Sequence, residues 1–243
     1  MLEVLNMFGI AQSQETLRSE QGKDVAQPIL GFFFLYLRIE RRILKEGYTI
    51  KDQSRAHFIT ITIVDWIDIF SRQTYRNLIT DSLSYCIKNK GMILYGYVIM
   101  TNHIHLIIQS EKGELSNLIR DFKKFTATQI LDRLQTTPES RREWILQRLH
   151  QATLSHNRNK NYQVWQSGNH AIEIYSEKFL WSKLDYIHLN PVRAGIVARA
   201  SDYLYSSASN YINGNGVMDE VTLADNPVVD VLKGWSMVRQ NLY

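Results

Sequence analysis

The feature that most constrains the fold is a pair of apolar segments with only two residues between them. MILYGYVIM (92–100) and HIHLIIQ (103–109) both have the composition of buried strands, and Thr101-Asn102 forms a turn-like break between them. We therefore expect two consecutive strands here. Gly96 lies inside the first strand and predicts a bulge.

Patterns on either side of this pair indicate the fold class. HFITITIV (57–64) alternates isoleucine with threonine, which predicts another strand. Residues 71–89 and 114–134 carry apolar side chains at helical spacing, and Ser71 is expected to be the N-cap of the first helix. The order strand, helix, strand, strand, helix predicts an α+β sandwich, in which an antiparallel sheet has helices on one face.

The second half of the chain has weaker signals. Residues 138–164 predict a short helix followed by a polar loop. Ser176 is expected to cap a helix that runs up to Pro191, because proline disfavours a helical residue before it. Asn213-Gly214 predicts a turn, and NPVVDVLKGW (226–235) predicts a short closing segment.

Composition limits the compartment and the partners. The charge balance is 28 − 24 = +4, which permits an anionic partner such as nucleic acid without requiring one. A single cysteine, Cys86, excludes an intramolecular disulfide and a multi-cysteine zinc site, and fits a reducing cytoplasm. The apolar run at 29–36 is far shorter than the roughly 20 residues that span a bilayer. We expect a soluble, cytoplasmic protein without a membrane partner.

Two histidines stand one residue apart in the strand at 103–109. Side chains alternate between the faces of a strand, so His103 and His105 project from the same face. Two neutral imidazoles in this arrangement can share a divalent metal. An H-x-H pattern alone is weak evidence, and the alternative is a pair of hydrogen-bonded core histidines.

A second polar group stands in LDYIHLNPVRAGIV (184–197). On a helix, Tyr186 and Asn190 are i, i+4 neighbours on one face, opposite a buried apolar face that includes Leu184. The alternatives are an ordinary aromatic residue at the core edge and an asparagine that ends the helix. His188 falls off the Tyr186–Asn190 face, and we expect it to be structural or solvent-facing.

Taken together, these segments resemble a known family. YVIMTNHIHLI (97–107) and YIHLNPVRAG (186–195) are similar to paired motifs of the REP-associated tyrosine transposases, a group of the IS200-like family of HUH single-tyrosine transposases. WQSGNHAI (165–172) and YLYSSASNY (203–211) also resemble pieces of that pattern.

The resemblance covers about residues 47–211 and implies one domain over that range. Its fold would be a ferredoxin-like sandwich of the HUH endonuclease type. Residues 1–46 would form an N-terminal extension of uncertain structure, and residues 212–243 a C-terminal tail.

The resemblance also implies a role for each matching residue. His103 and His105 correspond to metal ligands, Asn190 to a third polar ligand and Tyr186 to the nucleophile. In such enzymes Mg²⁺ or Mn²⁺ polarises the scissile phosphate of single-stranded DNA. The tyrosine then attacks to give a 5′-phosphotyrosine and a free 3′-OH. The implied activity is DNA cleavage and strand transfer in transposition and recombination.

Two other functions stay open. One is a domesticated HUH nuclease that acts on repeats without mobilising DNA. The other is a non-catalytic nucleic-acid-binding module whose histidine pair is structural.

The implied partner is single-stranded or hairpin DNA associated with repeats. Stacking and phosphate contacts would suit seven residues, namely Arg120, Lys123, Lys124, Trp165, Gln166, His170 and Arg193. The alternatives are a solvated helix face for the basic residues of 120–124 and core or turn positions for Trp165 and His170. A monomer and a homodimer both fit the sequence.

Overall fold

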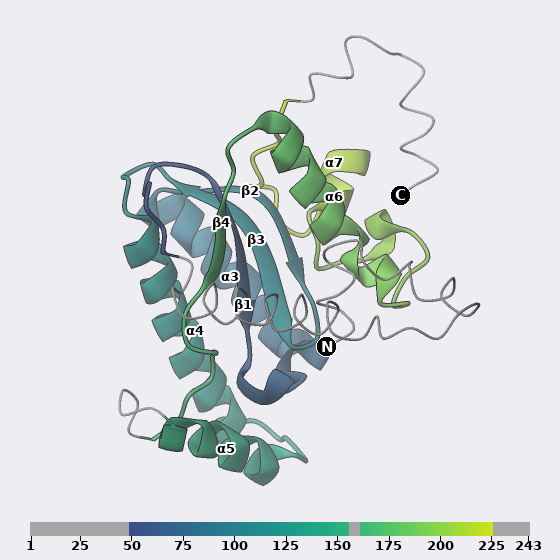
Figure 1. The fold of residues 1–243 in the computed structure, drawn as a ribbon. Helices are drawn as coiled ribbons and strands as arrows, with labels where there is room; N and C mark the ends of the chain where they lie inside the picture. The colour runs from purple at the N-terminus through teal and green to yellow at the C-terminus, as the bar shows by residue number, and fades with distance from the viewer. Residues whose placement is uncertain (1–48, 156–160, 226–243) are drawn as a thin grey trace, which may run out of the picture. The chain divides into compact units, whose positions relative to one another are not determined.

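A computed structural model describes residues 49–155 and 161–225 of the chain (Figure 1). The expected extension at 1–46 and the expected closing segment at 226–235 lie outside the described residues. None of the helices within the described ranges is long and apolar enough to cross a membrane.

The described residues contain a four-stranded antiparallel sheet in the order β2-β3-β1-β4. The strands are β1 (His57–Thr62), β2 (Met92–Ile99), β3 (His103–Ser110) and β4 (His170–Glu173). With the intervening helices this is a β-α-β-β-α-β arrangement, the ferredoxin-like order that was expected. β4 was not expected, because its four residues give too short an alternation to recognise.

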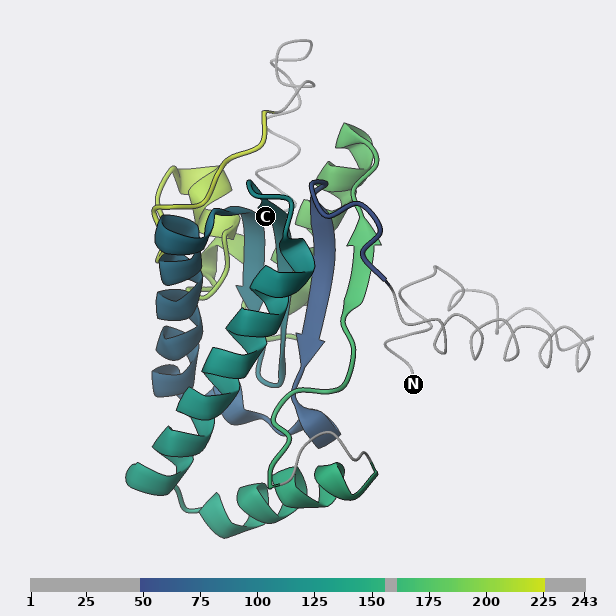
Figure 2. The same cartoon turned by 90° about the vertical axis from the view of Figure 1, so that its left-hand side faces the viewer.

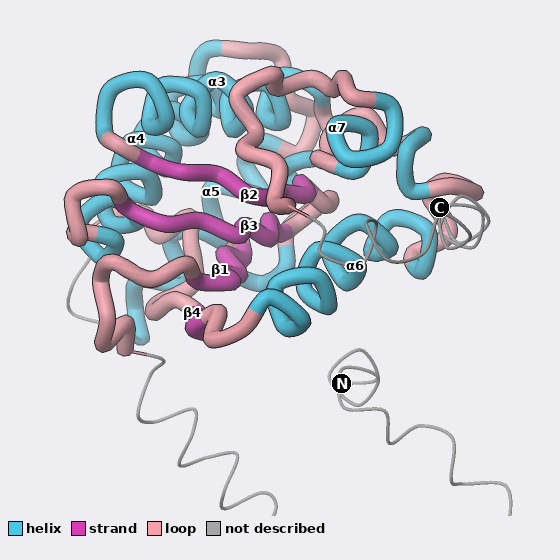
Figure 3. Tube along the Cα trace, turned by 90° about the horizontal axis from the view of Figure 1, so that it is seen from above, coloured by secondary structure: helices cyan, strands magenta, loops and turns pink. Residues whose placement is uncertain are grey.

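Helices cover both faces of the sheet, one of them more fully. α3 (Gln73–Lys90) and α4 (Leu115–Thr136) pack together on the first face, where the sandwich was expected to have its helices. Figure 1 shows α3 behind the strands, and Figure 2 shows α3 and α4 side by side. α6 (Glu177–Arg193) lies beside the strands on the side away from α3 and α4, as Figure 3 shows.

Shorter elements complete the described part. They are α5 (Arg142–Gln151), α7 (Ala208–Asn213) and the 3₁₀ turns η1 (Val64–Trp66), η2 (Ile69–Ser71), η3 (Ala152–Ser155) and η4 (Ala200–Asp202). The expected turn at Asn213-Gly214 is confirmed, because α7 ends at Asn213 and Gly214 is left-handed with φ 72°.

Strand alternation divides the residues of β1 and β3 between a core face and a second face. Ile59, Ile61, Ile104 and Leu106 are buried and point to the same face, since Ile59 pairs with Leu106 and Ile61 with Ile104. The opposite face therefore presents the residues between them, including the two histidines of β3.

Gly96 determines how closely α6 approaches the sheet. The expected bulge is confirmed by a register shift between Leu94 and Gly96. A Cβ on Gly96 would lie 2.6 Å from Leu184 Cδ2 and 3.0 Å from Ile187 Cδ1. Only a glycine accommodates α6 at this distance, and the same helix carries Tyr186.

Two expected helix boundaries were wrong. The first helix begins at Gln73 with Arg72 as N-cap, and Ser71 belongs to the preceding 3₁₀ turn. α6 continues through Pro191 to Arg193, because Pro191 is buried in the last turn and tertiary packing outweighs the preference of the preceding residue. The expected cap at Ser176 is confirmed, since Phe179 N–H donates to Ser176 Oγ at 3.2 Å.

Candidate active site

His103 and His105 form the centre of the site on the α6 side of the sheet. Their ring centroids lie 4.7 Å apart at an interplanar angle of 72°. His105 is 5% exposed, and the neighbouring His103 is half-buried. The strand alternation that was read from the sequence thus brings the two imidazoles together.

Each imidazole has a hydrogen-bond partner at Nδ1, a different polar side chain in each case. His103 Nδ1 is 2.7 Å from Asn102 Oδ1, and His105 Nδ1 is 2.9 Å from Thr60 Oγ1. His105 Nε2 is buried and has no hydrogen-bond partner within the described part of the chain. Metal-bound histidines have this pattern, with the second nitrogen held by a hydrogen bond. The residues therefore fit a divalent metal ion.

Burial keeps both histidines neutral at physiological pH. It lowers the pKa of His103 from 6.5 to about 4. The pKa of His105 is well below 6.5, chiefly through burial and further through His103, His170 and Lys183. Neutral imidazole is the form that binds metals.

Asn190 is the third candidate metal ligand that the resemblance implies. Within residues 49–155 and 161–225, no three His, Cys, Asp or Glu side chains form a group that could hold a metal ion. Asn190 is half-buried on α6, one turn after Tyr186 and on the same helix face.

α6 brings Tyr186 against the histidine pair. The Tyr186 ring meets the His105 ring edge to face, with 5.4 Å between centroids. Phe58 of β1 meets Tyr186 in the same way at 5.8 Å, and it stacks on His105 at 5.4 Å. Tyr186 is half-buried, and its ring contact with His105 places it in the same site as the imidazoles.

Two cations lie over the Tyr186 ring. Lys183 Nζ is 5.8 Å from the ring centroid, and Arg193 Cζ is 5.7 Å from it. Lys183 Nζ also lies 5.1 Å from the Phe58 ring, and burial lowers the pKa of its ammonium group. The sequence interpretation missed Lys183, although its position three residues before Tyr186 places it on the same helix face.

His170 and Arg193 are the two expected DNA contacts that the structure brings to this site. His170 of β4 is opposite Thr60, which is in turn opposite His105. The three side chains therefore project from the same face of the sheet. Burial, and then the charge of Lys183, lowers the pKa of His170.

Three other expected DNA contacts lie where α4 meets the segment before β4, namely Lys123 on α4 and Trp165 and Gln166 on that segment. Lys123 Nζ donates to Gln166 O, Gly168 O and Asn169 Oδ1 at 2.8 to 3.1 Å, and burial lowers its pKa to about 8. Trp165 is buried, and its Nε1–H donates to Lys123 O and to Thr126 Oγ1. In the described structure these side chains hold the chain in place ahead of His170.

The other two expected DNA contacts on α4 lie on its solvent side. Arg120 is exposed and pairs with Asp121 at 3.0 Å, and Lys124 is exposed. His188, by contrast, is buried at 2% exposure, and its Nε2 is 2.8 Å from Ser207 Oγ. The expectation that His188 is structural is confirmed, and it does not face solvent.

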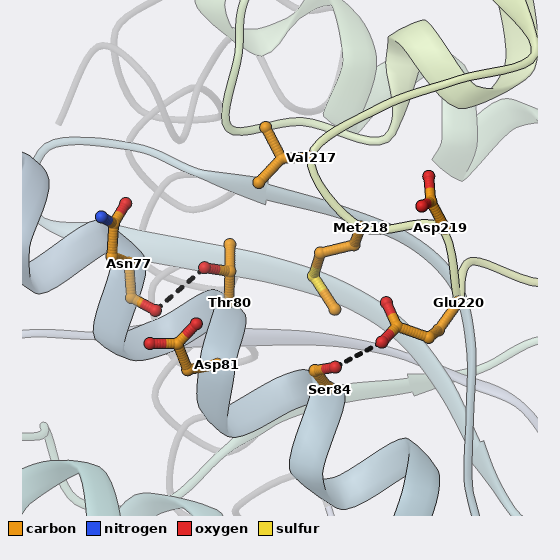
Figure 4. Close-up of a pocket in the computed structure, with 8 residues that line it drawn as sticks. All are labelled: Asn77, Thr80, Asp81, Ser84, Val217, Met218, Asp219 and Glu220. Atoms are coloured by element: carbon orange, nitrogen blue, oxygen red, sulfur yellow. Dashed lines mark hydrogen bonds between the residues drawn. The ribbon is translucent and has the colours of Figure 1, made fainter.

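A polar cleft elsewhere on the molecule is separate from this site. It lies between α3 and the segment 217–220 (Figure 4) and is lined by Asn77, Thr80, Asp81, Ser84, Val217, Met218, Asp219 and Glu220. Ser84 Oγ donates to Glu220, which also pairs with Lys88 at 2.7 Å. The acidic side chain of Glu220 is thus already satisfied by protein partners.

A model of one protein family matches the chain over more than half of its length. The model describes the IS200-like transposases, and it matches residues 51–184. The chain belongs to the IS200-like transposase family. The family match includes the strand with His103 and His105 and ends just before Tyr186.

One solved structure is also similar to this family member. It is described as a REP-associated tyrosine transposase bound to a REP hairpin, and it shares 18% identity and a TM-score of 0.48. The similarity covers 73% of this chain and 91% of that chain. No curated protein matches the sequence.

Proposed function

We propose that this member of the IS200-like transposases cleaves and transfers single-stranded DNA through a 5′-phosphotyrosine intermediate formed by Tyr186. One observation carries the proposal. The ring of Tyr186, from α6, lies against the imidazole of His105, from β3, and His105 in turn lies against His103. A nucleophile beside a potential metal site suits metal-assisted phosphodiester cleavage.

In this proposal His103, His105 and Asn190 hold Mg²⁺ or Mn²⁺. The ion, when bound, supplies a positive charge that polarises the phosphate and stabilises the charge that develops there. The buried Nε2 of His105 supports this assignment, as do the contacts that Asn102 and Thr60 make with the imidazoles. Imidazole suits Mn²⁺ better than Mg²⁺, so Mn²⁺ is expected to support activity at least as well.

Tyr186 must lose its proton to attack phosphorus, and an unperturbed phenol has a pKa near ~10. The positive charges of Lys183 and Arg193 favour the phenolate, because both lie within 6 Å of the ring centroid. The burial of Phe58 against Tyr186 keeps part of the site dry, which strengthens these interactions.

The attack joins Tyr186 Oη to phosphorus and breaks the bond to the upstream 3′ oxygen, which leaves as a 3′-OH after protonation. The covalent bond conserves the phosphodiester energy, so a 3′-OH can later displace the tyrosine without ATP. This reversibility suits strand transfer better than degradation. We propose single-stranded or hairpin DNA as the substrate, and a soluble, cytoplasmic protein that acts on it as a monomer or homodimer.

Adduct formation tests the proposal. The full chain would be incubated with Mn²⁺ and a pool of single-stranded hairpins that have randomised flanks. The label belongs at the 3′ end of the DNA, because the tyrosine retains the downstream fragment. We expect a labelled protein band on a denaturing gel. This band should disappear in Tyr186→Phe and persist in Tyr85→Phe, which changes an exposed tyrosine of α3.

Two results would contradict the proposal. An adduct that persists in Tyr186→Phe would exclude Tyr186 as the nucleophile. DNA binding by the wild type without any adduct across the pool would favour the non-catalytic binding module.

A further inference from the structure

Trp66 is an exposed aromatic residue beside the histidine pair that the mechanism above does not use. Its side chain is 54% exposed. The indole nevertheless contacts His103 edge to face, with 6.0 Å between the ring centroids. The indole therefore lies beside the proposed metal site, and much of the side chain remains open to solvent.

The backbone at Trp66 is strained. Asp65 and Trp66 have φ angles of 53° and 55°, in the left-handed region that non-glycine residues rarely adopt. Bulky side chains are especially uncommon there. Such strain persists only where the surroundings enforce it, and it is concentrated at functional sites.

Three contacts hold this conformation. Asp65 pairs with Arg148 of α5, with 3.2 Å between Oδ2 and Nε. Trp66 N–H donates to Ile63 O at 3.1 Å, and Trp66 O accepts from Asn102 Nδ2 at 3.3 Å. Two consecutive left-handed residues are thus fixed so that the indole faces outward.

Asn102 couples the position of Trp66 to that of the histidine. Its Nδ2 reaches Trp66 O, and its Oδ1 is 2.7 Å from His103 Nδ1. A single amide side chain therefore orients both the imidazole and the backbone that carries the indole. The backbone that carries the indole is therefore tied to a proposed metal ligand.

The charges around Trp66 are compatible with an anionic strand. Two acidic residues stand within two positions of it in the sequence, Asp65 and Asp68. Asp65 pairs with Arg148, and Asp68 pairs with Arg141 at 2.8 Å. Both negative charges are therefore compensated, and a phosphate backbone can approach the indole.

We propose that Trp66 stacks on a base of the single-stranded DNA, beside the phosphate that Tyr186 attacks. The inference rests on the proposed function and adds a residue that recognises the substrate. An exposed indole offers a π face that any base can cover, which gives affinity without sequence selectivity. Bases of a duplex are already stacked and paired, so the contact selects unpaired nucleotides.

Equilibrium binding to two probes tests this role apart from cleavage. One probe is fluorescein-labelled oligothymidylate of about twelve nucleotides, and the other is an abasic oligomer of the same length. All variants carry Tyr186→Phe to prevent covalent attachment. We expect the protein with Tyr186→Phe alone to bind the oligothymidylate about tenfold or more tightly than the abasic oligomer, because a stacked base contributes this much to affinity. Trp66→Ala should lose most of this preference without weaker binding of the abasic oligomer.

Three further variants distinguish a base-stacking role of Trp66 from a structural one. Trp66→Phe should keep much of the preference, and Trp66→Leu should lose it although it remains apolar. Tyr85→Ala removes an equally exposed ring from α3 and should change neither affinity. If Trp66→Ala unfolds the protein, the difference in probe preference between Trp66→Phe and Trp66→Leu still tests whether an aromatic ring is needed.

If Trp66→Ala weakens the binding of both probes equally, or changes the binding of neither, the proposal is overturned. Failure of the proposed function would look different, because the wild type would form no covalent adduct whatever the probe preference. Loss of the preference in Trp66→Leu but not in Trp66→Phe would support stacking in either case.

Discussion

Tyr186 of α6 and His105 of β3 meet edge to face, with 5.4 Å between their ring centroids. The two residues belong to separate motifs, and the packing of α6 on the sheet brings them together. The proposed chemistry therefore depends on three things: the histidines, the charge around the phenol and the position of α6. Each of these is open to a separate test.

The hydrogen bond between Thr60 and His105 should strengthen metal binding. If Nε2 of His105 binds the ion, Nδ1 carries the proton and donates to Thr60 Oγ1 at 2.9 Å. Thr60→Val keeps the shape of the side chain and removes this acceptor. We expect Mn²⁺ affinity to fall about 10- to 100-fold, as for other residues that orient a histidine ligand. Isothermal titration calorimetry measures this without DNA.

Matched variants identify the cause of any loss. Thr62→Val makes the same change on the same face of β1, opposite His103, and should bind Mn²⁺ nearly normally. His103→Ala with His105→Ala should abolish Mn²⁺ binding and metal-dependent cleavage, whereas His150→Ala on α5 should not. Full activity of the double variant in EDTA would refute the metal site.

Lys183 should accelerate cleavage through its charge. Its ammonium group lies 5.8 Å from the Tyr186 ring centroid, where it favours the phenolate and attracts the phosphate. Lys183→Met keeps the apolar stem and removes the charge, and we expect the rate of adduct formation to fall roughly 10- to 100-fold. Single-turnover kinetics at saturating DNA measure this step.

Lys178 provides the control for Lys183. It is an exposed lysine of α6, five residues nearer the N-terminus of the helix. Lys178→Met should leave the single-turnover rate within about twofold. Equal losses in the two variants would indicate a general effect of charge on DNA binding and would contradict a specific role for Lys183.

The sequence predicts those parts of the site that the periodicity of a single strand or helix determines. Strand alternation alone places His103 and His105 on one face, and helical spacing alone groups Tyr186 with Asn190. Joining the two groups required the resemblance, since packing of α6 on Gly96 is a tertiary contact. The sequence gives no sign of the left-handed backbone at Trp66, which neighbouring elements enforce.

The contacts of Lys123 likewise depend on tertiary packing that the sequence does not show. Lys123 was expected on a solvated or DNA-binding helix face, because its spacing on α4 is all that the sequence offers. The structure instead surrounds its amine with three oxygens of residues 166–169. That segment is remote in sequence and has no regular pattern, so its path could not be predicted.

The small size of Gly96 should control both stability and activity. A Cβ there would lie 2.6 Å from Leu184 Cδ2, so Gly96→Ala must displace α6 or repack its buried face. We expect a loss of about 1–3 kcal/mol in the free energy of unfolding. Adduct formation should slow as well, because α6 carries Tyr186. Urea unfolding and the gel assay measure the two effects.

A double variant tests whether the contact with Leu184 is the cause. Leu184→Ala alone should destabilise the protein by about 2–5 kcal/mol, since the side chain is fully buried. In the presence of Gly96→Ala, this truncation makes room for the new methyl group. The combined loss should then be at least about 0.5 kcal/mol smaller than the sum of the single losses. Additive losses would show that α6 is not packed against Gly96 as described.

Burial of His188 should make stability depend on pH. Its pKa is lowered from 6.5 to about 3, because the imidazole is fully buried. Below pH 6.5 the unfolded chain therefore binds a proton that the folded chain does not accept, and stability is lost as the pH falls toward 3. Between pH 7 and pH 5 this residue alone should cost about 2 kcal/mol.

His188→Gln isolates this contribution from those of His103 and His105, whose pKa values are also lowered by burial. The variant has no titrating group at 188 and retains an amide that can reach Ser207, the present partner of His188. It should be less stable than the wild type at pH 7, and the difference should shrink by about 2 kcal/mol at pH 5. Urea unfolding at both pH values gives the comparison, and a difference that stays constant would mean that His188 does not resist protonation in the folded protein.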